Sequence, residues 1–568
     1  MRSLRVHVVF FFLLLFGAII IGRLVFVQII DHDFYKALAI GQQRLSELIK
    51  PERGEIFAKD KDGLLYVLAT SNKSKFVFVS PNKIDGDKEE IAEKLSLILD
   101  IEKEEIFRKL NVEDSFFVVL KKRLTEKEVE EIEKLEIEGI FLEDESFRYY
   151  PEEDFISRVL GFVGGEKYGQ YGLEAFYEDQ LKGIEGIAEG ERSSRGYMVF
   201  FDPEKSLPAS PGSDLVLEID YYIQFKAEEL LKEAKENLDI EGGQIIVSDP
   251  NSGKIIALAS LANFNPNNYS DYELEVFMNP VSQKLFEPGS VFKPLTMAVG
   301  IEEDLITPQT TYYDEGFVKV GPDTIYNYNE RVFGETTMTE VLEKSINTGA
   351  VFVEQQIPHN VFLDYIEEFG IFSKTGIDLQ GEVFSTNEEL KKGYEVNFAT
   401  AAFGQGIEMT PVQLIRSFSI FANGGNILKP YLVGEIRGSD GSIIKTKTEI
   451  QRESVISEAT ASKITAMLVS VIEEGFGKQA KIPGYYIAGK TGTAQVPWSA
   501  LGIDRSGYSE KTIQTFIGFA PAFNPRFLVL VKLDNPKTRT AEYSAVPVFR
   551  DLAKYIVDYY QIPPDYED

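Results

Sequence analysis

An apolar segment near the N-terminus constrains this chain more than any other feature. Fifteen consecutive residues from Val8 to Gly22 are apolar or glycine, and the run resumes after Arg23 and continues to Ile30. At about 1.5 Å per residue, a helix over residues 8–30 just crosses a hydrocarbon core of about 30 Å. A cleaved signal peptide is the alternative, but the run is long and no Ala-x-Ala pattern follows it. We therefore expect a retained transmembrane anchor.

The charges on either side of this segment predict its orientation. Arg2 and Arg5 precede it, whereas Asp31 and Asp33 follow it. The positive-inside bias then places the short N-terminal tail in the cytoplasm and the rest of the chain outside. Arg23 either extends its guanidinium to the outer interface or contacts a partner helix in the membrane. No ATP is present outside, and the sequence has no Gly-rich phosphate-binding loop followed by Lys and Ser or Thr.

The composition excludes several classes of function. The 568 residues include 59 Lys and Arg against 90 Asp and Glu, which gives a net charge of −31. Folded domains are expected, and nucleic acid is not a partner, because the charge repels phosphates and no basic patch occurs. Without cysteine there is no disulfide, thiolate nucleophile or Cys-bound metal, and we expect neither metal nor cofactor. Of the histidines His7, His32 and His359, only His359 could serve a Ser-His triad, so a serine nucleophile is expected to use a lysine base.

Residues 31–210 mix helices and short strands without regular alternation. Helical patterns lie at residues 88–99, 103–110 and 126–135, and strand patterns at residues 75–79 and 116–120. Residues 53–69 predict a β-hairpin whose turn is Asp62-Gly63. We expect a structural pedestal without a catalytic group. The linker composition of residues 206–212 places its end near residue 210.

The pattern changes after residue 210. Strands are predicted at residues 214–219, 243–249, 254–259, 486–495, 512–519 and 526–533, and helices at residues 222–238 and 548–559. Sheet strands from both ends of the region, with a helical middle, indicate an α+β domain with an antiparallel sheet flanked by helices. The predicted organisation is a cytoplasmic tail, an anchor, a pedestal and a catalytic domain, at residues 1–7, 8–30, 31–210 and 211–568.

One Ser-x-x-Lys sequence lies at a predicted helix start. Ser290 and Lys293 share a helical face, so the lysine amine can reach the serine hydroxyl. Pro294 is tolerated only in the first turn, which places Ser290 near the helix N-terminus, where free N–H groups favour developing negative charge. The same spacing at Ser80 and at Ser442 is predicted to fall in a turn and in a hairpin strand.

Two further elements complete an ordered set. Ser345 and Asn347 follow 55 residues after Ser290, as a hydroxyl and an amide that could meet over the same site. Lys490 begins a Lys-Thr-Gly-Thr sequence on a predicted strand, 145 residues after Ser345. Gly492 would allow a ligand backbone to approach this strand closely.

This ordered set resembles the active site of the penicillin-recognising acyl-serine transferases. Ile346 stands where that motif usually has Asp. Further stretches resemble class B penicillin-binding proteins, which cross-link peptidoglycan: residues 403–411, 422–425 and 516–521 resemble their transpeptidase domain, and residues 53–57, 171–174 and 181–183 their pedestal. Asp60-Lys-Asp-Gly63 replaces the usual Asp-Arg-x-Gly. The resemblance covers nearly the whole chain, and residues 287–293 and 345–349 are more similar to division-type members than to elongation-type ones.

The resemblance implies an acyl-enzyme mechanism. Ser290 would attack the penultimate D-Ala carbonyl of a stem pentapeptide and release the terminal D-Ala, and an amine of a second stem peptide would resolve the acyl-enzyme. Lys293 would be the base, which requires its pKa to fall from about 10.4 towards 7 through burial and the Lys490 cation. Ser345 would relay the proton, and Asn347 would orient either the substrate or Lys293.

The resemblance also implies a substrate-binding strand. Lys490, Thr491 and Thr493 would hold the substrate carboxylate, with Gly492 between the two threonines. Backbone N–H groups of Ser290 and Thr493 would form the oxyanion hole.

The resemblance further implies partners and a location. The partners are peptidoglycan stem peptides, β-lactams as covalent inhibitors, a polytopic membrane glycosyltransferase of the shape, elongation, division and sporulation class, and other division proteins. The location is the bacterial cytoplasmic membrane, and the role is septal wall synthesis. The alternatives are an elongation-type transpeptidase, a β-lactamase, a β-lactam sensor and a catalytically silent divisome scaffold.

Overall fold

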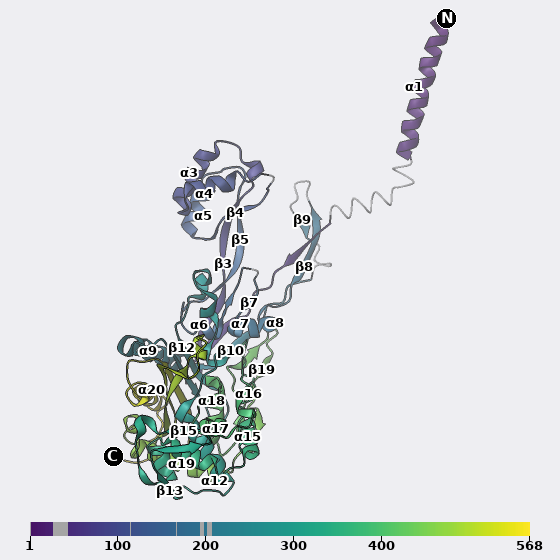
Figure 1. Cartoon of the computed structure of the whole chain (residues 1–568). Helices are drawn as coiled ribbons and strands as arrows, with labels where there is room; N and C mark the ends of the chain where they lie inside the picture. Colours follow the sequence, from purple (N-terminus) through teal and green to yellow (C-terminus); the bar gives the residue numbers. More distant parts are fainter. Residues whose placement is uncertain are drawn as a thin grey trace. The chain divides into compact units, whose positions relative to one another are not determined.

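The computed structural model describes residues 2–25, 44–113, 115–165, 167–192, 198–201 and 207–567. The chain divides into two compact units (Figure 1). The first unit consists of residues 1–53 and 182–212, and the second of residues 54–181 and 213–568. The second unit therefore combines most of the predicted pedestal with the predicted catalytic region, while the exact domain boundaries stay a prediction.

The first unit contains one helix and a small antiparallel sheet. Helix α1 spans Arg2–Val25, and β1 (Arg44–Ile49), β8 (Gly186–Arg192) and β9 (Met198–Phe201) form a sheet in the order β1-β8-β9. Ser210 and Leu207 pair with Ile184 and Ile187 through backbone hydrogen bonds. The proline-containing segment predicted as a linker thus forms isolated β-bridges and no regular strand, since Pro208 and Pro211 lack the N–H that a continuous ladder needs.

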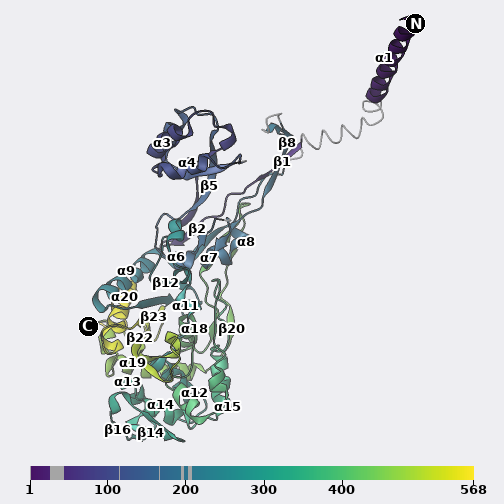
Figure 2. The same cartoon turned by 45° about the horizontal axis from the view of Figure 1, so that its top comes forward.

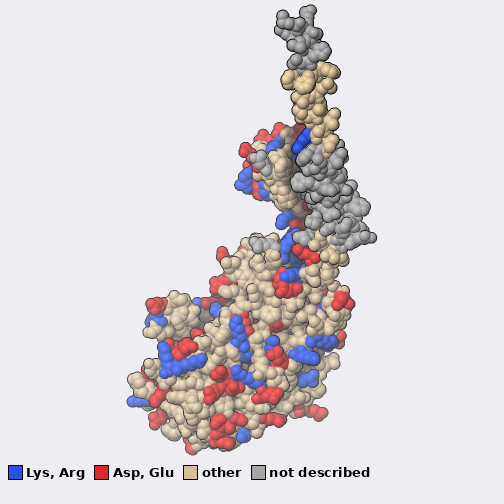
Figure 3. Space-filling view, turned by 90° about the vertical axis from the view of Figure 1, so that its right-hand side faces the viewer, with Lys and Arg blue, Asp and Glu red and all other residues tan. Residues whose placement is uncertain are grey.

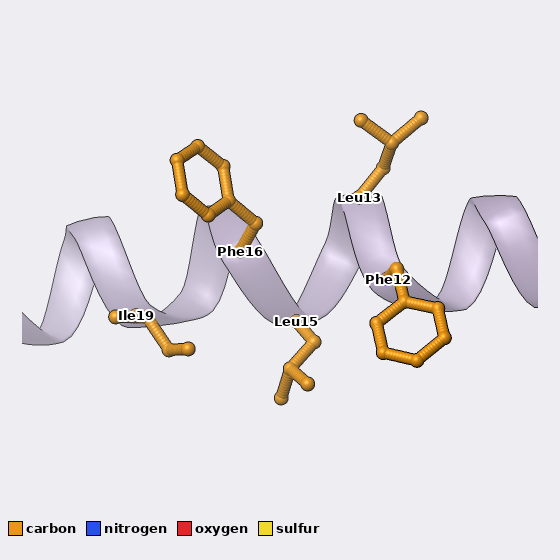
Figure 4. Close-up of a pocket in the computed structure, with 5 residues that line it drawn as sticks. All are labelled: Phe12, Leu13, Leu15, Phe16 and Ile19. Atoms are coloured by element: carbon orange, nitrogen blue, oxygen red, sulfur yellow. The ribbon is translucent and has the colours of Figure 1, made fainter.

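Helix α1 exposes apolar side chains. A shallow apolar hollow on this helix alone is lined by Phe12, Leu13, Leu15, Phe16 and Ile19 (Figure 4). These side chains carry no titratable group, so the hollow supplies no catalytic chemistry. Within the described residues, no helix has both the length and the apolarity that crossing a membrane requires. The predicted span at residues 8–30 is therefore not confirmed, and its last part, residues 26–30, lies outside the described residues.

The pedestal part of the second unit is built on antiparallel strands. These are β2 (Ile56–Lys59), β3 (Leu65–Val79), β4 (Val118–Leu124) and β5 (Ile140–Tyr149). The predicted hairpin is confirmed, since β2 pairs with β3. Its turn forms because Asp60 Oδ1 accepts hydrogen bonds from the N–H groups of Asp62 and Leu64, while Gly63 adopts φ +83°.

Three helices cover one end of these strands. They are α3 (Lys88–Leu99), α4 (Lys103–Leu110) and α5 (Glu126–Glu133), which confirms the predicted helices to within two residues. Asp87 caps α3, and Thr125 with Glu128 forms a capping box at α5. Leu95 and Leu99 share a face of α3 and pack into a separate apolar core with strand residues of β3 and β4. Figures 1 and 2 show α3 and α4 together at one end of β5.

The pedestal strands belong to a larger sheet that joins the two parts of this unit. Its order is β19-β18-β10-β2-β3-β4, with β5 paired to β3. Here β10 is Asp214–Asp220, β18 is Val433–Arg437 and β19 is Ile443–Lys445. The strand β10 runs parallel to β2 and antiparallel to β18. The strand that we predicted at the start of the catalytic domain is therefore paired directly with the pedestal.

The catalytic part contains a five-stranded antiparallel sheet in the order β12-β11-β23-β22-β21. Its strands are β11 (Gly242–Ser248), β12 (Ile255–Leu261), β21 (Ala488–Pro497), β22 (Tyr508–Ala520) and β23 (Phe527–Asp534). Helices α9 (Tyr221–Leu238) and α20 (Ala545–Tyr560) cover one face, and α18 (Pro411–Phe418) and α19 (Glu458–Glu473) cover the other. In Figure 2, β22 and β23 lie between α20 and α18. The predicted α+β architecture with a helix-flanked antiparallel sheet is confirmed.

The remaining elements of the second unit are short connections or form the helical middle. In the pedestal part they are η2 (Pro81–Lys83), α6 (Ser157–Leu160), β6 (Phe162–Val163), β7 (Gly169–Gln170), α7 (Gly172–Phe176) and α8 (Glu178–Leu181). Between β12 and α14 they are η3 (Pro266–Asp271), α10 (Leu274–Phe277), α11 (Pro280–Gln283), η4 (Gly289–Phe292), α12 (Lys293–Glu302), β13 (Thr311–Asp314), β14 (Phe317–Val320), β15 (Asp323–Tyr326), η5 (Tyr328–Glu330), β16 (Gly334–Thr337) and α13 (Met338–Glu343). From α14 onward they are α14 (Asn347–Glu354), α15 (His359–Glu368), α16 (Glu388–Lys391), α17 (Glu395–Ala401), η6 (Ser419–Phe421), β17 (Ile427–Leu428), β20 (Ile450–Arg452), η7 (Lys478–Ala480), η8 (Ser499–Leu501) and η9 (Ala541–Tyr543).

Acidic and basic side chains are interspersed over the described surface in Figure 3. That face carries no continuous basic patch of the kind that nucleic-acid binding uses.

Candidate active site

The turn that carries Ser290 opens a buried helix. The 3₁₀ turn η4 leads directly into α12, whose first residue is Lys293 and whose second is Pro294. Proline is accommodated there because the first-turn N–H groups have no intrahelical acceptor, as the sequence predicted. Ser290 is partly exposed, whereas Lys293 is 0% exposed.

The other two Ser-x-x-Lys sequences lie where the sequence predicted. Ser80 precedes the short turn η2 directly after β3, and Ser442 precedes β19 in a hairpin with β18. Neither opens an α-helix of the length of α12, so only Ser290 combines this spacing with a buried helix start.

A glycine loop holds the turn of Ser290 in place. The N–H of Gly289 donates to the carbonyl oxygen of Gly404 at 2.9 Å, and Phe286 and Met409 exchange two further backbone bonds. Gly404 has φ +81°, and a Cβ at this position would lie 2.1 Å from the Gly289 oxygen. The residue at 404 must therefore be glycine for this approach to exist.

Gly492 serves a contact within the protein. A Cβ there would lie 3.0 Å from Val291 Cγ1 and 3.2 Å from the Pro288 oxygen, both in or next to η4. We predicted that Gly492 allows a ligand backbone to approach. The side of Gly492 on which a Cβ would lie faces this turn, because β21 packs directly against η4; the approach of a ligand backbone to the strand stays a prediction.

The amine of Lys293 points to the Ser345 loop. It donates to the carbonyl oxygen of Ser345 at 2.6 Å, to Asn347 Oδ1 at 2.9 Å and to Ser345 Oγ at 3.3 Å. Among the described residues, no hydrogen bond joins it to Ser290 Oγ. The contact that we expected from the i, i+3 spacing is therefore replaced by contacts to a loop more than 50 residues away.

Ser345 lies between two buried lysines. Its Oγ also accepts a hydrogen bond from Lys490 Nζ at 3.0 Å, and that amine donates to the Thr491 carbonyl oxygen at 3.0 Å. Ser345 has φ +53°, a left-handed conformation that is uncommon for a residue with a side chain and is found at functional turns. Helix α13, which precedes it, is fixed by a capping box of Thr337 and Glu340.

Burial disfavours the charged form of both lysines and so lowers the pKa of each. The pKa of Lys293 is lowered well below its ordinary value by burial first and by the charge of Lys490 second. Burial alone lowers the pKa of Lys490 to about 7. Both side chains are 0% exposed and, among the described residues, neither forms an ion pair with a carboxylate. A neutral amine is therefore accessible near neutral pH.

Asn347 links the lysine to a neighbouring hairpin. Its Oδ1 accepts from Lys293, and its Nδ2 donates to the carbonyl oxygen of Tyr326 at 3.1 Å. Both ends of the amide are thus used, which favours the alternative in which Asn347 orients Lys293. The next residue, Thr348, donates through Oγ1 to the buried carboxylate of Asp314 at 2.6 Å.

The two threonines of the Lys-Thr-Gly-Thr sequence alternate with Lys490 along β21. Thr491 is buried, and Thr493 is partly exposed. Thr493 Oγ1 accepts a hydrogen bond from the N–H of Ala541 at 3.2 Å, so its own hydrogen remains available to a ligand. The strand β21 is the last in the sheet order, which leaves one of its backbone edges without a partner strand in the described part.

Sequence reasoning did not assign a role to three residues beside this site. Asp314 accepts hydrogen bonds from the Gly316 N–H and from Thr348 Oγ1, just after Ser345, and Glu287 and Tyr508 bond to each other next to the turn of Ser290. A single buried carboxylate at a strand end or in a loop has no periodic sequence signal. Only the Glu-Pro-Gly run before Ser290 could have pointed to Glu287, as an acid immediately before a tight turn.

His359 belongs to a different cluster. Its ring stacks on Phe398 with 3.9 Å between centroids, and its Nε2 lies 3.4 Å from Glu354 Oε1. No group of three or more potential ligands that could hold a metal occurs among the residues that the structure describes.

Two family models match most of the chain. The penicillin binding protein transpeptidase domain matches residues 243–554, and the penicillin-binding protein dimerisation domain matches residues 48–217. The first of these covers more than half of the sequence and includes every site residue named above.

Individual relatives match along nearly the full length. Stage V sporulation protein D of Bacillus subtilis is 32% identical over 536 residues, which are 93% of this chain and 81% of that protein. A peptidoglycan D,D-transpeptidase FtsI homolog of Mesostigma viride is 28% identical over 576 residues, which are 96% of this chain and 94% of that protein.

A solved structure shares the fold. The structure of penicillin binding protein 3 from Mycobacterium tuberculosis, complexed with aztreonam, aligns with a TM-score of 0.68 at 24% identity and covers 92% of this chain and 98% of that one. The two domain matches and the Bacillus subtilis relative, which is more than 30% identical along nearly the whole chain, show that the chain belongs to the penicillin-binding protein transpeptidase family, as a class B member.

Proposed function

We propose that this chain is a peptidoglycan D,D-transpeptidase that works through an acyl-enzyme on Ser290. The observation that carries the proposal is the convergence of two fully buried lysines on the hydroxyl of Ser345, next to the helix that Ser290 opens. The family membership and the printed name of the Mesostigma viride relative support the same reaction.

Acylation begins with the removal of a proton from Ser290. The three donations of Lys293 belong to its ammonium form; the neutral amine has two N–H donors, which keep the two shorter contacts, to the Ser345 carbonyl oxygen and Asn347 Oδ1, while the longer donation to Ser345 Oγ is given up. The lone pair of the amine is then left to accept the hydroxyl proton. Ser290 Oγ attacks the penultimate D-Ala carbonyl carbon, the peptide bond to the terminal D-Ala breaks, and the proton passes through Ser345 to the leaving amine.

The positive charge of Lys490 assists this proton transfer through Ser345. As an ammonium, Lys490 donates to Ser345 Oγ, which leaves the hydrogen of Ser345 free to move between Lys293 and the leaving amine. The same positive charge attracts the carboxylate of the terminal D-Ala, for which Thr491 and Thr493 provide hydroxyl donors. The resolving step reverses the sequence, with an amine of a second stem peptide in place of the leaving group.

The substrate class is a stem peptide in extended conformation. The outer edge of β21 offers backbone N–H and C=O groups to such a peptide, as an edge strand does in β-augmentation. The backbone N–H groups of Ser290 and Thr493 would form the oxyanion hole, which contributes about 3 to 4 kcal/mol per donor. A β-lactam presents a carboxylate and a strained amide to the same groups and would acylate Ser290 as an inhibitor.

The cellular role that we propose is septal wall synthesis at the bacterial cytoplasmic membrane, with residues 8–30 as the anchor, the N-terminus in the cytoplasm and the catalytic domain outside. The apolar exposed surface of α1 supports an anchor, and the likeness of residues 287–293 and 345–349 to division-type members supports septal synthesis over elongation. A polytopic glycosyltransferase and other division proteins would be the partners. Recovery of the full chain in the membrane fraction after alkaline extraction, with residues 31–568 accessible to external protease, tests this location.

The test of the reaction is covalent labelling with a fluorescent penicillin, followed by peptide mapping. Ser290→Ala should lose all labelling while keeping the wild-type melting temperature within a few degrees. His359→Ala is the matched control and should be labelled at the wild-type rate, because its ring contacts Phe398 and Glu354. Labelling that survives in Ser290→Ala would overturn the assignment.

The lifetime of the label separates the rival enzymes. A transpeptidase holds the penicilloyl group for minutes to hours, whereas a β-lactamase releases it within milliseconds. Release of D-Ala from a stem pentapeptide, with a second stem peptide as acceptor, distinguishes a transpeptidase from a sensor or a silent scaffold, which would be labelled without cross-linking.

A further inference from the structure

Glu287 lies three residues before Ser290 and takes no part in the chemistry described above. The residue is 8% exposed. Its Oε1 accepts hydrogen bonds from the N–H of Gly406 at 3.0 Å and from the hydroxyl of Tyr508 at 3.3 Å. Its Oε2 is buried and has no hydrogen-bond partner within the described part of the chain. The carboxyl thus joins segments that lie 119 and 221 residues away in sequence.

Both of these segments also hold the turn of Ser290. Gly406 belongs to the loop in which the Gly404 oxygen accepts from the Gly289 N–H. Tyr508 is the first residue of β22 and pairs with Pro497 of β21, the strand that carries Lys490. A single carboxyl therefore connects the nucleophile turn, the glycine loop and the hairpin of β21 and β22.

The surroundings of Glu287 favour a neutral carboxyl. The titratable and charged groups that face it are Tyr508 from β22 and Glu408 from the loop after α17, and among the described residues no cation pairs with it. Burial raises the pKa of Glu287 to about 7, and the charge of Glu408 adds to this rise, while the bonds from Gly406 and Tyr508 oppose it. An ionised Oε2 would be a buried negative oxygen without a donor.

We propose that Glu287 is a positioning residue whose neutral carboxyl clamps the turn of Ser290 against the β21 hairpin, so that its ionisation slows acylation. The inference rests on the proposed function, because the two oxyanion-hole donors would come from Ser290 and Thr493 on different segments. Their alignment depends on the contact between η4 and β21, and a misplacement of about 1 Å can cost about 10²-fold in rate.

The proposal predicts how the acylation rate depends on pH. The rate rises as Lys293 loses its proton and falls above about pH 7 as Glu287 loses its own. Lys490 titrates in the same range, so the wild-type profile alone does not separate these groups. The ratio of the Glu287→Gln rate to the wild-type rate does, because both proteins contain the same lysines.

The experiment measures second-order acylation rates of the detergent-solubilised full chain with a labelled penicillin from pH 5.5 to 9. Below pH 6, Glu287→Gln should match the wild type within about twofold, since the amide preserves the oxygen that accepts from Gly406. Above pH 8, we expect Glu287→Gln to be about tenfold faster, because only the wild type carries a buried charge there. Glu287→Ala should be slow at every pH and be rescued by Gln at that position.

Glu228→Gln is the matched control. The pKa of Glu228 is also raised to about 7 by burial, but its carboxyl bonds to Ile156, Gln224 and Asn263. Its rate ratio to the wild type should not change with pH. A ratio for Glu287→Gln that is equally flat, with wild-type label on Ser290, would overturn the inference and leave the proposed function intact. Wild type without label on Ser290 would overturn both.

A second variant tests the proposal if Glu287→Gln does not fold. Tyr508→Phe removes a hydrogen bond that lowers the pKa of Glu287, so the alkaline fall in rate should move to higher pH. In the wild type, the infrared difference spectrum between pH 6 and 8.5 should show a buried carboxyl losing its proton, and this band should weaken or shift in Tyr508→Phe. An alkaline limb unchanged in Tyr508→Phe would contradict the proposal.

Discussion

Ser345 Oγ accepts hydrogen bonds from two amines, and this sharing determines which lysine can act as the base. Lys490 contacts Ser345 and its own strand, so its charge is held by a hydroxyl and a carbonyl oxygen. Lys293 contacts the carbonyl oxygen of Ser345 and Asn347, and the nearby charge of Lys490 lowers its pKa further. Two like charges at this separation are unfavourable in a buried site, and Lys293 is the one placed next to the nucleophile turn.

Replacing Lys293 by arginine keeps the positive charge and removes the base. A guanidinium does not lose its proton near neutral pH, so Lys293→Arg should acylate about 10² to 10⁴ times more slowly with penicillin. Stopped-flow or gel-based labelling rates measure this directly. The matched control is Lys374→Arg in the second Lys-Thr-Gly sequence, which should keep the wild-type rate because the side chain of Lys374 is exposed. Acylation of Lys293→Arg within threefold of the wild type would show that the base lies elsewhere.

The residue types of the site could be predicted from the sequence, but their contacts could not. The order Ser-x-x-Lys, Ser-x-Asn and Lys-Thr-Gly-Thr identifies which side chains carry the chemistry. The amine of Lys293 nevertheless points to Ser345 and Asn347, 52 and 54 residues away, and Gly492 lies against the turn of Ser290. Local spacing shows which residues share a face, whereas long-range packing decides which of the possible partners an amine reaches.

At the scale of elements, the site depends on how closely the turn η4 approaches its neighbours. The Gly404 loop contacts it from one side and β21 from the other, and both approaches use glycines without side-chain volume. Gly289 itself has φ +61°, and a Cβ there would lie 2.9 Å from the Cβ of Ala494 on β21. The nucleophile turn is therefore held by backbone contacts on both sides, which suits a group that must keep its N–H aligned with a donor on another strand.

Gly404→Ala should separate backbone strain from steric overlap. Alanine at φ +81° costs about 1 to 2 kcal/mol wherever it occurs, and at 404 its Cβ would also lie 2.1 Å from the Gly289 oxygen. We expect a loss of acylation rate of about 10²-fold together with a lower melting temperature. Gly393→Ala is the matched control, because Gly393 has φ +82° and open space around it. It should lose similar conformational stability and keep its acylation rate; equal rates in the two variants would contradict a steric role for Gly404.

Periodicity predicted the elements well and their partners less well. The helices at 88–99, 103–110 and 222–238 and the five strands of the catalytic sheet follow from apolar spacing that local geometry dictates. The parallel pairing of β10 with β2 joins segments about 160 residues apart, and apolar strands of this kind fit several neighbours equally well. That pairing places pedestal and catalytic region in one sheet, which no local pattern indicates.

At the scale of the whole molecule, a buried carboxyl ties the pedestal part to the catalytic part of the second unit. Glu228 on α9 accepts hydrogen bonds from the Ile156 N–H of the pedestal at 2.9 Å, from Gln224 Nε2 at 2.9 Å and, through Oε2, from Asn263 Nδ2 at 3.1 Å. Gln224 in turn bonds both backbone groups of Leu258 on β12. Burial raises the pKa of Glu228 to about 7, so this joint contains a carboxyl that titrates near neutrality.

The stability of this joint should therefore fall as pH rises. A carboxyl whose pKa is raised on folding stabilises the native state at low pH, and this contribution is lost between about pH 4.5 and 7 as the folded protein gives up its proton. Glu228→Gln has no such titration. The difference in melting temperature, variant minus wild type, should therefore become more positive from pH 5.5 to pH 8.5. The change should correspond to about 1 to 3 kcal/mol in the free energy of unfolding. Glu241→Gln provides the contrast: the pKa of Glu241 is lowered by its hydrogen bond with Lys511, so its difference from the wild type should stay constant over that range. The lysines of the active site titrate identically in all three proteins and cancel in these differences. If the melting-temperature difference between Glu228→Gln and the wild type does not change with pH, Glu228 is already ionised in the native joint.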